Sequence, residues 1–195
     1  MELILASRSP RRAALLRQAG IPHRVILSDL PEGEQQQFLD PIEMAVSLAL
    51  QKARGVAATL QEGLVLGADT LICHGGEILG KPADRGEARR MLRCLSGGRH
   101  RVITGLALVD VQANKQESCF CETRVWMRIL EDELIDAYVA TGEPMDKAGA
   151  YAIQGKAAIF IEKLEGCYFN VVGLPLHQLS LLLSRMGIKP WSGWR

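Results

Sequence analysis

Short apolar runs and segments of helical periodicity alternate along this chain, and that alternation most constrains its fold. Residues 3–5 form an apolar run typical of a buried strand. Ser9 and Pro10 predict the start of a helix that stops at Gly20, because serine suits the N-cap, proline the first turn and glycine the C-terminal end. Residues 22–28 predict a second strand, so a strand, a helix and another strand open the chain.

The middle of the chain adds further helices and two hairpins. Asp40 and Pro41 predict a capped helix start, and apolar residues repeat at helical spacing from there to Val56. Residues 64–79 turn back at a Gly-Gly pair and predict a hairpin. The runs HRVITGLALVD and ESCFCETRVWMRIL, joined by the polar turn QANK, predict a longer antiparallel pair. Helices are also expected within RGEARRMLRCL, EDELIDAYVAT and the stretch after VVG.

Strands and hairpins mixed with helices predict an α/β fold in which helices flank a mixed sheet. A purely parallel sheet is disfavoured by the hairpins. No internal repeat or low-complexity tract interrupts the 195 residues, of which 48% are hydrophobic. We therefore expect one compact domain over residues 1–195.

Charge and composition exclude several classes of function. The 23 basic and 22 acidic residues give a formal net charge of +1, so no global field attracts nucleic acid, and an anion site must be local. No run approaches the roughly 18 apolar residues of a membrane span, and no signal pattern opens the chain. We expect a soluble, cytoplasmic protein with no membrane and no stable nucleic-acid partner. Its five cysteines are odd in number and lack zinc spacing, which favours reduced thiols.

The segment SRSPRR, residues 7–12, concentrates hydroxyls and arginines at a predicted helix start. A helix N-terminus presents unpaired N–H groups and a partial positive charge, so this segment suits a phosphate group. A capped helix whose arginines are solvated is the alternative. The common glycine-rich phosphate loops are absent from the sequence.

Asp69 and Thr70 interrupt an otherwise apolar strand. Because a buried carboxylate is costly when unpaired, Asp69 either bonds to backbone within a hairpin or bulge, or faces a polar cleft that holds a metal ion or a water. Lys52 borders the apolar stripe of its helix. Lys81, between Gly80 and Pro82, either points at the same cleft or lies on a plain surface turn.

The stretch DKAGAYAIQG, residues 146–155, is rich in small residues. Small residues let the backbone approach a ligand closely, and Gln154 offers a donor and an acceptor, as reading the edge of a pyrimidine requires. A glycine-bounded loop without function is the alternative. The four histidines lie apart from one another and from any nucleophile arrangement, so they predict no catalytic role.

Together these motifs resemble the Maf family of nucleotide pyrophosphatases. The resemblance runs in order from end to end through SRSPRR, the QKA around Lys52, GADT at 67–70, GKP at 80–82, LSG at 95–97, TG at 104–105, DKAGAYAIQG and VVGLPL at 171–176. It implies a mixed, strongly curved sheet with a cleft between two lobes. It also implies an enzyme that hydrolyses a nucleoside triphosphate to the monophosphate and pyrophosphate, requires a divalent cation such as Mg²⁺ or Mn²⁺, and often forms a homodimer.

The resemblance also implies roles for individual residues. Asp69 would accept the proton of the attacking water and would help to hold the metal. Ser9, Arg12, Lys52 and Lys81 would hold the triphosphate. Glu32 is expected as a second metal ligand, but the family's usual acidic pair reads LPEGE here, which leaves Glu34 as the alternative.

Base preference is implied by three positions. Arg12, Thr70 and Gln154 match the branch of the family that acts on dTTP and UTP rather than on 7-methyl-GTP. The ranking among dTTP, UTP, CTP and modified pyrimidine nucleotides stays open. Clearing such nucleotides before polymerisation is the implied use. The rival hypothesis is a non-catalytic nucleotide-binding regulator of cell division, which would not need Asp69.

Overall fold

The computed structural model describes residues 2–27 and 40–191 and shows a mixed sheet. Its strands are β1 (Leu3–Ala6), β2 (His23–Val25), β3 (Leu64–His74), β4 (Glu77–Leu79), β5 (Arg99–Asp110), β6 (Lys115–Met127) and β7 (Ile161–Glu165). Within the described residues seven strands pair in the order β2-β1-β3-β5-β6-β7, with β4 beside β3. β1 runs parallel to β2 and β3, whereas β4 is antiparallel to β3 and β7 to β6. The mixed α/β class expected from the sequence is confirmed.

Five of the six α-helices within the described residues lie close to where the sequence predicts them, whereas α5 is not predicted. The helices are α1 (Pro10–Gln18), α2 (Pro41–Ala57), α3 (Arg85–Leu95), α4 (Asp132–Ala140), α5 (Tyr168–Val172) and α6 (Leu176–Arg185), with 3₁₀ turns η1 (Glu143–Asp146), η2 (Ala148–Ala150) and η3 (Lys156–Phe160). The expected cap of α2 is confirmed, because Asp40 accepts the backbone N–H of Ile42 at 2.9 Å. The second strand is shorter than predicted and spans His23–Val25.

Two expectations from composition can be compared with the structure. Among residues 2–27 and 40–191, no helix combines the length and the apolar character that crossing a bilayer requires. The five cysteines form no disulfide, as expected for reduced thiols.

The chain divides into two compact units. The first consists of Met1–Asp69, Thr104–Cys121 and Gly173–Arg195, and the second of Thr70–Ile103 and Glu122–Val172. β3, β5 and β6 are long enough to contribute residues to both units.

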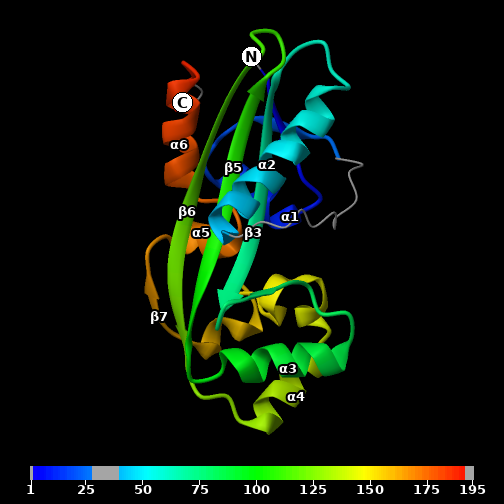
Figure 1. Cartoon of the computed structure of the whole chain (residues 1–195), viewed down its shortest axis with the longest axis vertical. Coiled ribbons are helices and arrows are strands. Elements are labelled where there is room, and N and C mark those ends of the chain that lie inside the picture. The colour runs from blue at the N-terminus through cyan, green and yellow to red at the C-terminus, as the bar shows by residue number, and fades with distance from the viewer. Residues whose placement is uncertain (1, 28–39, 192–195) are drawn as a thin grey trace. The chain divides into compact units, whose positions relative to one another are not determined.

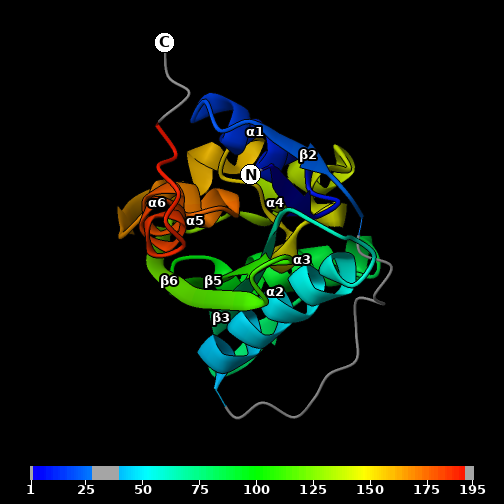
Figure 2. The same cartoon turned by 90° about the horizontal axis from the view of Figure 1, so that it is seen from above.

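In the first unit, α2 packs directly on β3 and β5 (Figures 1 and 2). The contact is made by small residues: a Cβ atom built on Gly67 would lie 2.0 Å from the backbone oxygen of Ala49. A Cβ atom on Gly105 would lie 2.2 Å from the backbone oxygen of Ala45. Both positions therefore exclude any side chain, and the helix backbone rests on the strand backbone. Ala49 and Ala45 are fully buried in this contact.

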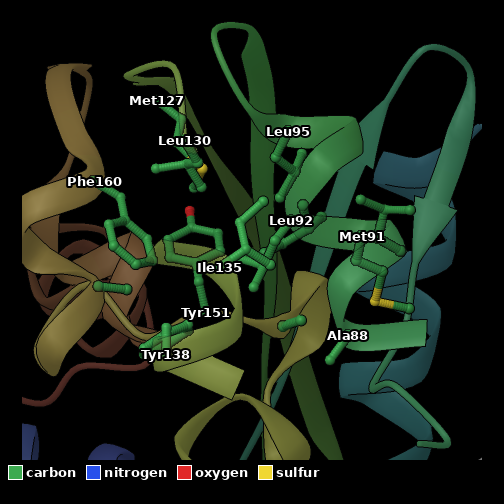
Figure 3. Packing of buried hydrophobic residues seen from close by; sticks show 14 of the residues in the cluster. Ala88, Met91, Leu92, Leu95, Met127, Leu130, Ile135, Tyr138, Tyr151 and Phe160 are labelled. Carbon is green, nitrogen blue, oxygen red and sulfur yellow. The ribbon is translucent and has the colours of Figure 1, made fainter. Parts of the chain in front are cut away.

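The second unit has an apolar core between α3, α4 and the turns that follow α4 (Figure 3). Leu92 and Leu95 of α3 are fully buried. From α4, Tyr138 packs edge to face on Phe160, with ring centroids 5.0 Å apart. The aromatic and aliphatic side chains thus give a fixed base to the segment that carries Gln154.

Candidate active site

Arg12 is the arginine of the opening segment that the fold buries. It is 9% exposed, and its Nε donates to the backbone oxygen of Gly173 at 2.8 Å. Its Nη1 donates to the backbone oxygen of Ala68 at 2.8 Å and to Ser7 Oγ at 3.1 Å. The interpretation in which the arginines here are solvated is therefore wrong for Arg12, although Arg8 is exposed. Arg12 ties the start of α1 to the strand residue that precedes Asp69.

Ser9 occupies the N-cap position of α1, but it does not act as the sequence predicts. Its side chain makes no capping hydrogen bond, and its own N–H donates to Ser7 Oγ at 3.1 Å. Ser7 therefore satisfies one backbone group and one arginine N–H at the same hydroxyl. The Ser9 hydroxyl is not engaged in capping, and the residue is partly exposed.

Lys52 and Asp69 form an ion pair in the first unit. Lys52 Nζ lies 2.5 Å from Asp69 Oδ1, and the two side chains are only 21% and 14% exposed. The partner of Asp69 is thus a side chain of α2 and not local backbone. The interpretation of Asp69 as a hairpin residue is wrong, because it lies well before the Gly75-Gly76 turn in the middle of β3.

The close packing of α2 on β3 explains why these two groups meet. Lys52 precedes Ala53, whose backbone nitrogen is 2.9 Å from the position a Cβ would take on Gly67. Asp69 lies two residues beyond Gly67, so it points to the same side of the strand. Within β3, Asp69 and Thr70 are partly exposed while the five preceding residues are buried. Asp69 is therefore the first residue of β3 that solvent reaches.

Three of the expected site residues belong to the second unit. Thr70 is partly exposed in β3, whereas Lys81 and Gln154 are exposed on irregular segments. The segments of Lys81 and Gln154 are joined by a backbone hydrogen bond from Gly149 N–H to the Gly80 oxygen at 3.0 Å. The structure thus links the GKP turn to the DKAGAYAIQG segment, which the sequence alone does not predict.

Tyr151 of this segment forms a buried pair with His100. His100 Nε2 is 2.7 Å from the Tyr151 hydroxyl, and the two residues are only 1% and 5% exposed. Burial, with a smaller contribution from the nearby charge of His74, lowers the pKa of His100 to about 4. Burial, and to a lesser extent Tyr138, raises the pKa of Tyr151. Both groups are therefore neutral at pH 7, and the hydrogen bond between them fixes the Tyr151 side chain.

The expected metal ligands are only partly within the described residues. Glu32 and its alternative Glu34 lie outside them. In residues 2–27 and 40–191, no three His, Cys, Asp or Glu side chains are grouped to hold a metal ion. Mg²⁺ is usually bound through one or two carboxylates together with substrate phosphates. Asp69, a partly exposed carboxylate, fits that mode of binding.

Comparison with solved structures first defines the class of fold. The Staphylococcus aureus Ham1 protein matches 95% of this chain and 100% of its own length with a TM-score of 0.52, at 13% sequence identity. The two proteins therefore share a fold. The family model described as "Maf-like protein" matches residues 2–186, and the chain belongs to this family.

Curated relatives cover almost the whole chain. A protein of Pelotomaculum thermopropionicum named dTTP/UTP pyrophosphatase is 50% identical over 95% of this chain and 97% of its own length. A protein of Methanosarcina barkeri with the same name is 46% identical over 96% of this chain and 95% of its own length.

Tyr138 and Glu143 bond to the segment around Gln154, and reasoning from the sequence missed them. Tyr138 reads as an ordinary core position of an amphipathic helix, and Glu143 as a solvated turn residue after Gly142. The partners of Glu143 lie 5 and 13 residues away, and no motif spacing indicates such a contact.

Proposed function

We propose that this chain hydrolyses dTTP and UTP to the nucleoside monophosphate and pyrophosphate. Relatives named dTTP/UTP pyrophosphatase that are 45–50% identical over at least 95% of the chain support the substrate class. The observation that carries the chemistry is Asp69, a strand carboxylate held 2.5 Å from Lys52 Nζ at the point where β3 becomes accessible.

In this proposal Asp69 accepts a proton from the attacking water. The water oxygen forms a bond to the α phosphorus, the bond from that phosphorus to the bridging oxygen breaks, and pyrophosphate leaves with the electron pair of the broken bond. Lys52 has three N–H donors and gives one to Asp69, so the others can reach phosphate oxygens and offset their charge. Without such cations, phosphate charge repels an incoming hydroxide.

A divalent cation, Mg²⁺ or Mn²⁺, completes the proposal. Asp69, together with Glu32 or Glu34, would hold it with the substrate phosphates. When bound, it would acidify water and neutralise phosphate charge. The remaining steps belong to the protein's own side chains.

In this proposal the triphosphate is also bound by Ser9, Lys81 and Arg12. The base preference is set by Arg12, Thr70 and Gln154. Arg12 also has partners within the protein. Its Nε and Nη1 bond to backbone oxygens and to Ser7, so it holds the backbone beside Asp69. For Gln154, exposure on a turn leaves the amide accessible to a base.

A panel of triphosphates tests the proposal directly. Pyrophosphate release is measured from dTTP, UTP, CTP, 7-methyl-GTP and dGTP with Mg²⁺, with Mn²⁺ and with a chelator. We expect release from dTTP and UTP with a metal, and none with the chelator. Absence of release with every substrate and metal would contradict an enzymatic role, and nucleotide binding without turnover would support the regulator instead. Preference for 7-methyl-GTP would contradict the branch assignment alone.

Assembly and location complete the proposal. We expect a homodimer in the cytoplasm, as the family resemblance implies. Sedimentation at several protein concentrations measures the oligomeric state, and fractionation of cells measures the location.

A further inference from the structure

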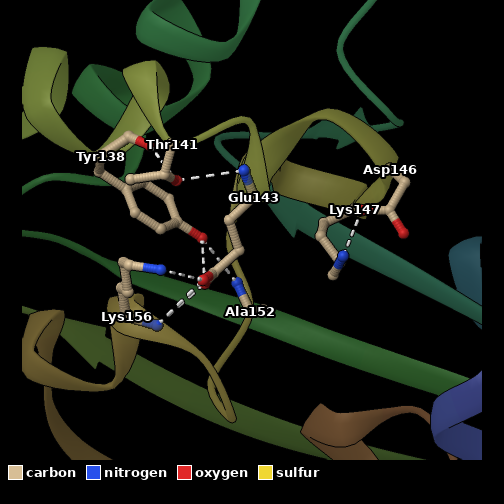
Figure 4. A network of polar contacts seen from close by, with 7 residues as sticks. All are labelled: Tyr138, Thr141, Glu143, Asp146, Lys147, Ala152 and Lys156. Carbon is tan, nitrogen blue, oxygen red and sulfur yellow. Dashed lines mark hydrogen bonds and ion pairs between the residues drawn. The ribbon is translucent and has the colours of Figure 1, made fainter.

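The backbone on both sides of Gln154 is held by the side chains of Tyr138 and Glu143 (Figure 4). On one side, the Tyr138 hydroxyl accepts the N–H of Ala152 at 3.3 Å. On the other side, Glu143 Oε1 accepts the N–H of Lys156 at 3.0 Å. Gln154 is therefore flanked, two residues away in each direction, by a tethered backbone amide.

Tyr138 and Glu143 also bond to each other. The Tyr138 hydroxyl donates to Glu143 Oε1 at 3.0 Å, so the two tethers form one connected network. Burial, and next the charge of Glu143, raises the pKa of Tyr138. The phenol therefore keeps its proton throughout the neutral range and remains a donor to the carboxylate. We name these two side chains the 138–143 clamp.

The clamp rests on fixed parts of the second unit. The Tyr138 ring is almost fully buried against Phe160. The backbone N–H of Glu143 donates to Thr141 Oγ1 at 3.2 Å, and Thr141 Oγ1 donates to the backbone carbonyl oxygen of Tyr138 at 2.7 Å. The end of α4 thus holds Glu143 from both its side chain and its backbone.

The glycine at position 155 is a second observation that supports the 138–143 clamp. Its φ of −103° is negative, so a left-handed backbone is not the reason for glycine there. A Cβ on Gly155 would instead lie 2.0 Å from Glu143 Oε1 and 2.5 Å from its Cδ. The space next to Gln154 is therefore occupied by the Glu143 carboxylate, and only a residue without a side chain leaves it in place.

The ion pair between the Lys156 and Glu143 side chains is not the important contact. Lys156 Nζ lies 3.8 Å from Glu143 Oε2, and the lysine side chain is 69% exposed. Exposed pairs of this kind contribute little, because solvent screens them. The backbone N–H of Lys156 gives the carboxylate a shorter, charge-assisted hydrogen bond.

We propose that Tyr138 and Glu143 are positioning residues for base selection, which act by fixing the backbone on both sides of Gln154. This inference rests on the proposed role of Gln154 in reading the base. A glutamine amide discriminates bases only when its donor and acceptor are held in one orientation, and an irregular surface segment does not supply that by itself. The clamp supplies it without touching the nucleotide.

The test compares kcat and KM for dTTP and dGTP in a small set of variants. Tyr138→Phe removes only the hydroxyl and keeps the ring on Phe160, and Glu143→Ala removes the acceptor. Both should lower the dTTP-to-dGTP ratio of kcat/KM by about tenfold, the effect of about one hydrogen bond, and mainly through KM for dTTP. Glu143→Gln keeps Oε1 as an acceptor, so this variant should retain most of the dTTP-to-dGTP ratio.

Matched controls use exposed residues of the same unit. Tyr168→Phe and Glu133→Ala make the same chemical changes at exposed positions outside the clamp and should leave both constants unchanged. Hydrogen exchange of the Ala152 amide should accelerate in Tyr138→Phe and that of the Lys156 amide in Glu143→Ala, and neither should change in Glu133→Ala. Equal losses of kcat on both nucleotides, without a change in the ratio, would overturn the inference.

A double-variant cycle separates this inference from the proposed function. If the clamp acts through Gln154, Glu143→Ala should no longer change the ratio once Gln154→Ala is present. An unchanged effect in that background would overturn the clamp's role. If Gln154→Ala alone leaves the ratio unchanged while dTTP is still hydrolysed, base reading by Gln154 is wrong, the inference falls with it, and the hydrolytic function stands.

Discussion

The groups of the first unit that carry the proposed chemistry are held differently from the residue of the second unit that is proposed to read the base. Lys52 and Asp69 lie on a regular helix and strand and bond directly to each other. Gln154 lies on an irregular segment whose backbone is tied down by two side chains that do not come from that segment. Reaction rate and base preference should therefore respond to different substitutions, and this separation can be measured.

Asp69→Asn should have the largest effect, because it removes the proposed proton acceptor. We expect kcat to fall by about 10³-fold, the usual size of a general-base contribution. Nucleotide binding should persist, since Lys52 is then released from its carboxylate partner, and the preference for dTTP over dGTP should not change. Pyrophosphate release and calorimetric titration measure the two properties. An Asp69→Asn variant that keeps most of its turnover would contradict the proposed role of Asp69 as proton acceptor.

Acid should weaken the second unit through His100. Its pKa is lowered to about 4 from the ordinary value of 6.5, so between these pH values the unfolded chain binds a proton that the folded chain does not. The stabilisation is present above about pH 6.5 and is lost as the pH falls towards about 4, by about 3 kcal/mol at most. Urea unfolding at several pH values measures it.

The matched variant for His100 is His100→Gln, which offers Tyr151 a polar partner that does not titrate. Subtracting its pH profile from that of the unaltered protein removes the contribution of the carboxylates. The difference should fall between about pH 6.5 and 4. A flat difference would mean that His100 is accessible to protons in the folded state.

Lys52→Met should lower kcat/KM by about 100-fold, because it removes a cation from the phosphates and leaves Asp69 without its partner. The loss should be the same for dTTP and dGTP, since Lys52 is not expected to contact the base. The matched control is Arg54→Met, which removes a cation of the same helix that bonds to Gln116. Steady-state rates of pyrophosphate release measure both. A change in the dTTP-to-dGTP ratio would break the separation of the two regions.

Gly155→Ala should have the smallest of these effects, and it should change the base preference and not the rate. The added methyl group displaces the Glu143 carboxylate, so we expect the dTTP-to-dGTP ratio to fall by about tenfold with little change in kcat. Gly86→Ala is the control, because its nearest contact is the flexible Asp84 side chain at 3.1 Å. A loss of kcat/KM that is equal for dTTP and dGTP, as expected for Lys52→Met, would contradict the separation.

Local signals in the sequence predict the elements well. Asp40 before Pro41 and the apolar spacing that follows define α2, because capping and periodicity act over a few residues. The same reasoning assigns Ser9 the wrong contact. Serine is a good N-cap, but here Ser7 supplies the hydroxyl that accepts the Ser9 N–H. Ser7 Oγ also accepts from Arg12 Nη1, a contact between side chains that capping preferences do not predict.

Contacts between distant residues are beyond such signals. The position of Lys52 beside the apolar stripe is predictable, but its bond to Asp69 depends on how closely α2 approaches β3. The burial of His100 and its bond to Tyr151, 51 residues away, likewise follow from packing and not from local pattern. The family resemblance identifies only residues that lie within its motifs. The residues that hold these site residues in place lie outside the motifs.

The contact of α2 with Gly67 and Gly105 sets how far the side chain at position 52 must extend. If either glycine carried a side chain, the helix would have to move outward, and a lysine that now ends against Asp69 would stop short of it. Two residues with no functional group thereby act as a spacer for the chemistry. A survey of variants that ranks positions by their distance from the nucleotide would overlook both, yet substitutions there should be among the least tolerated in the first unit.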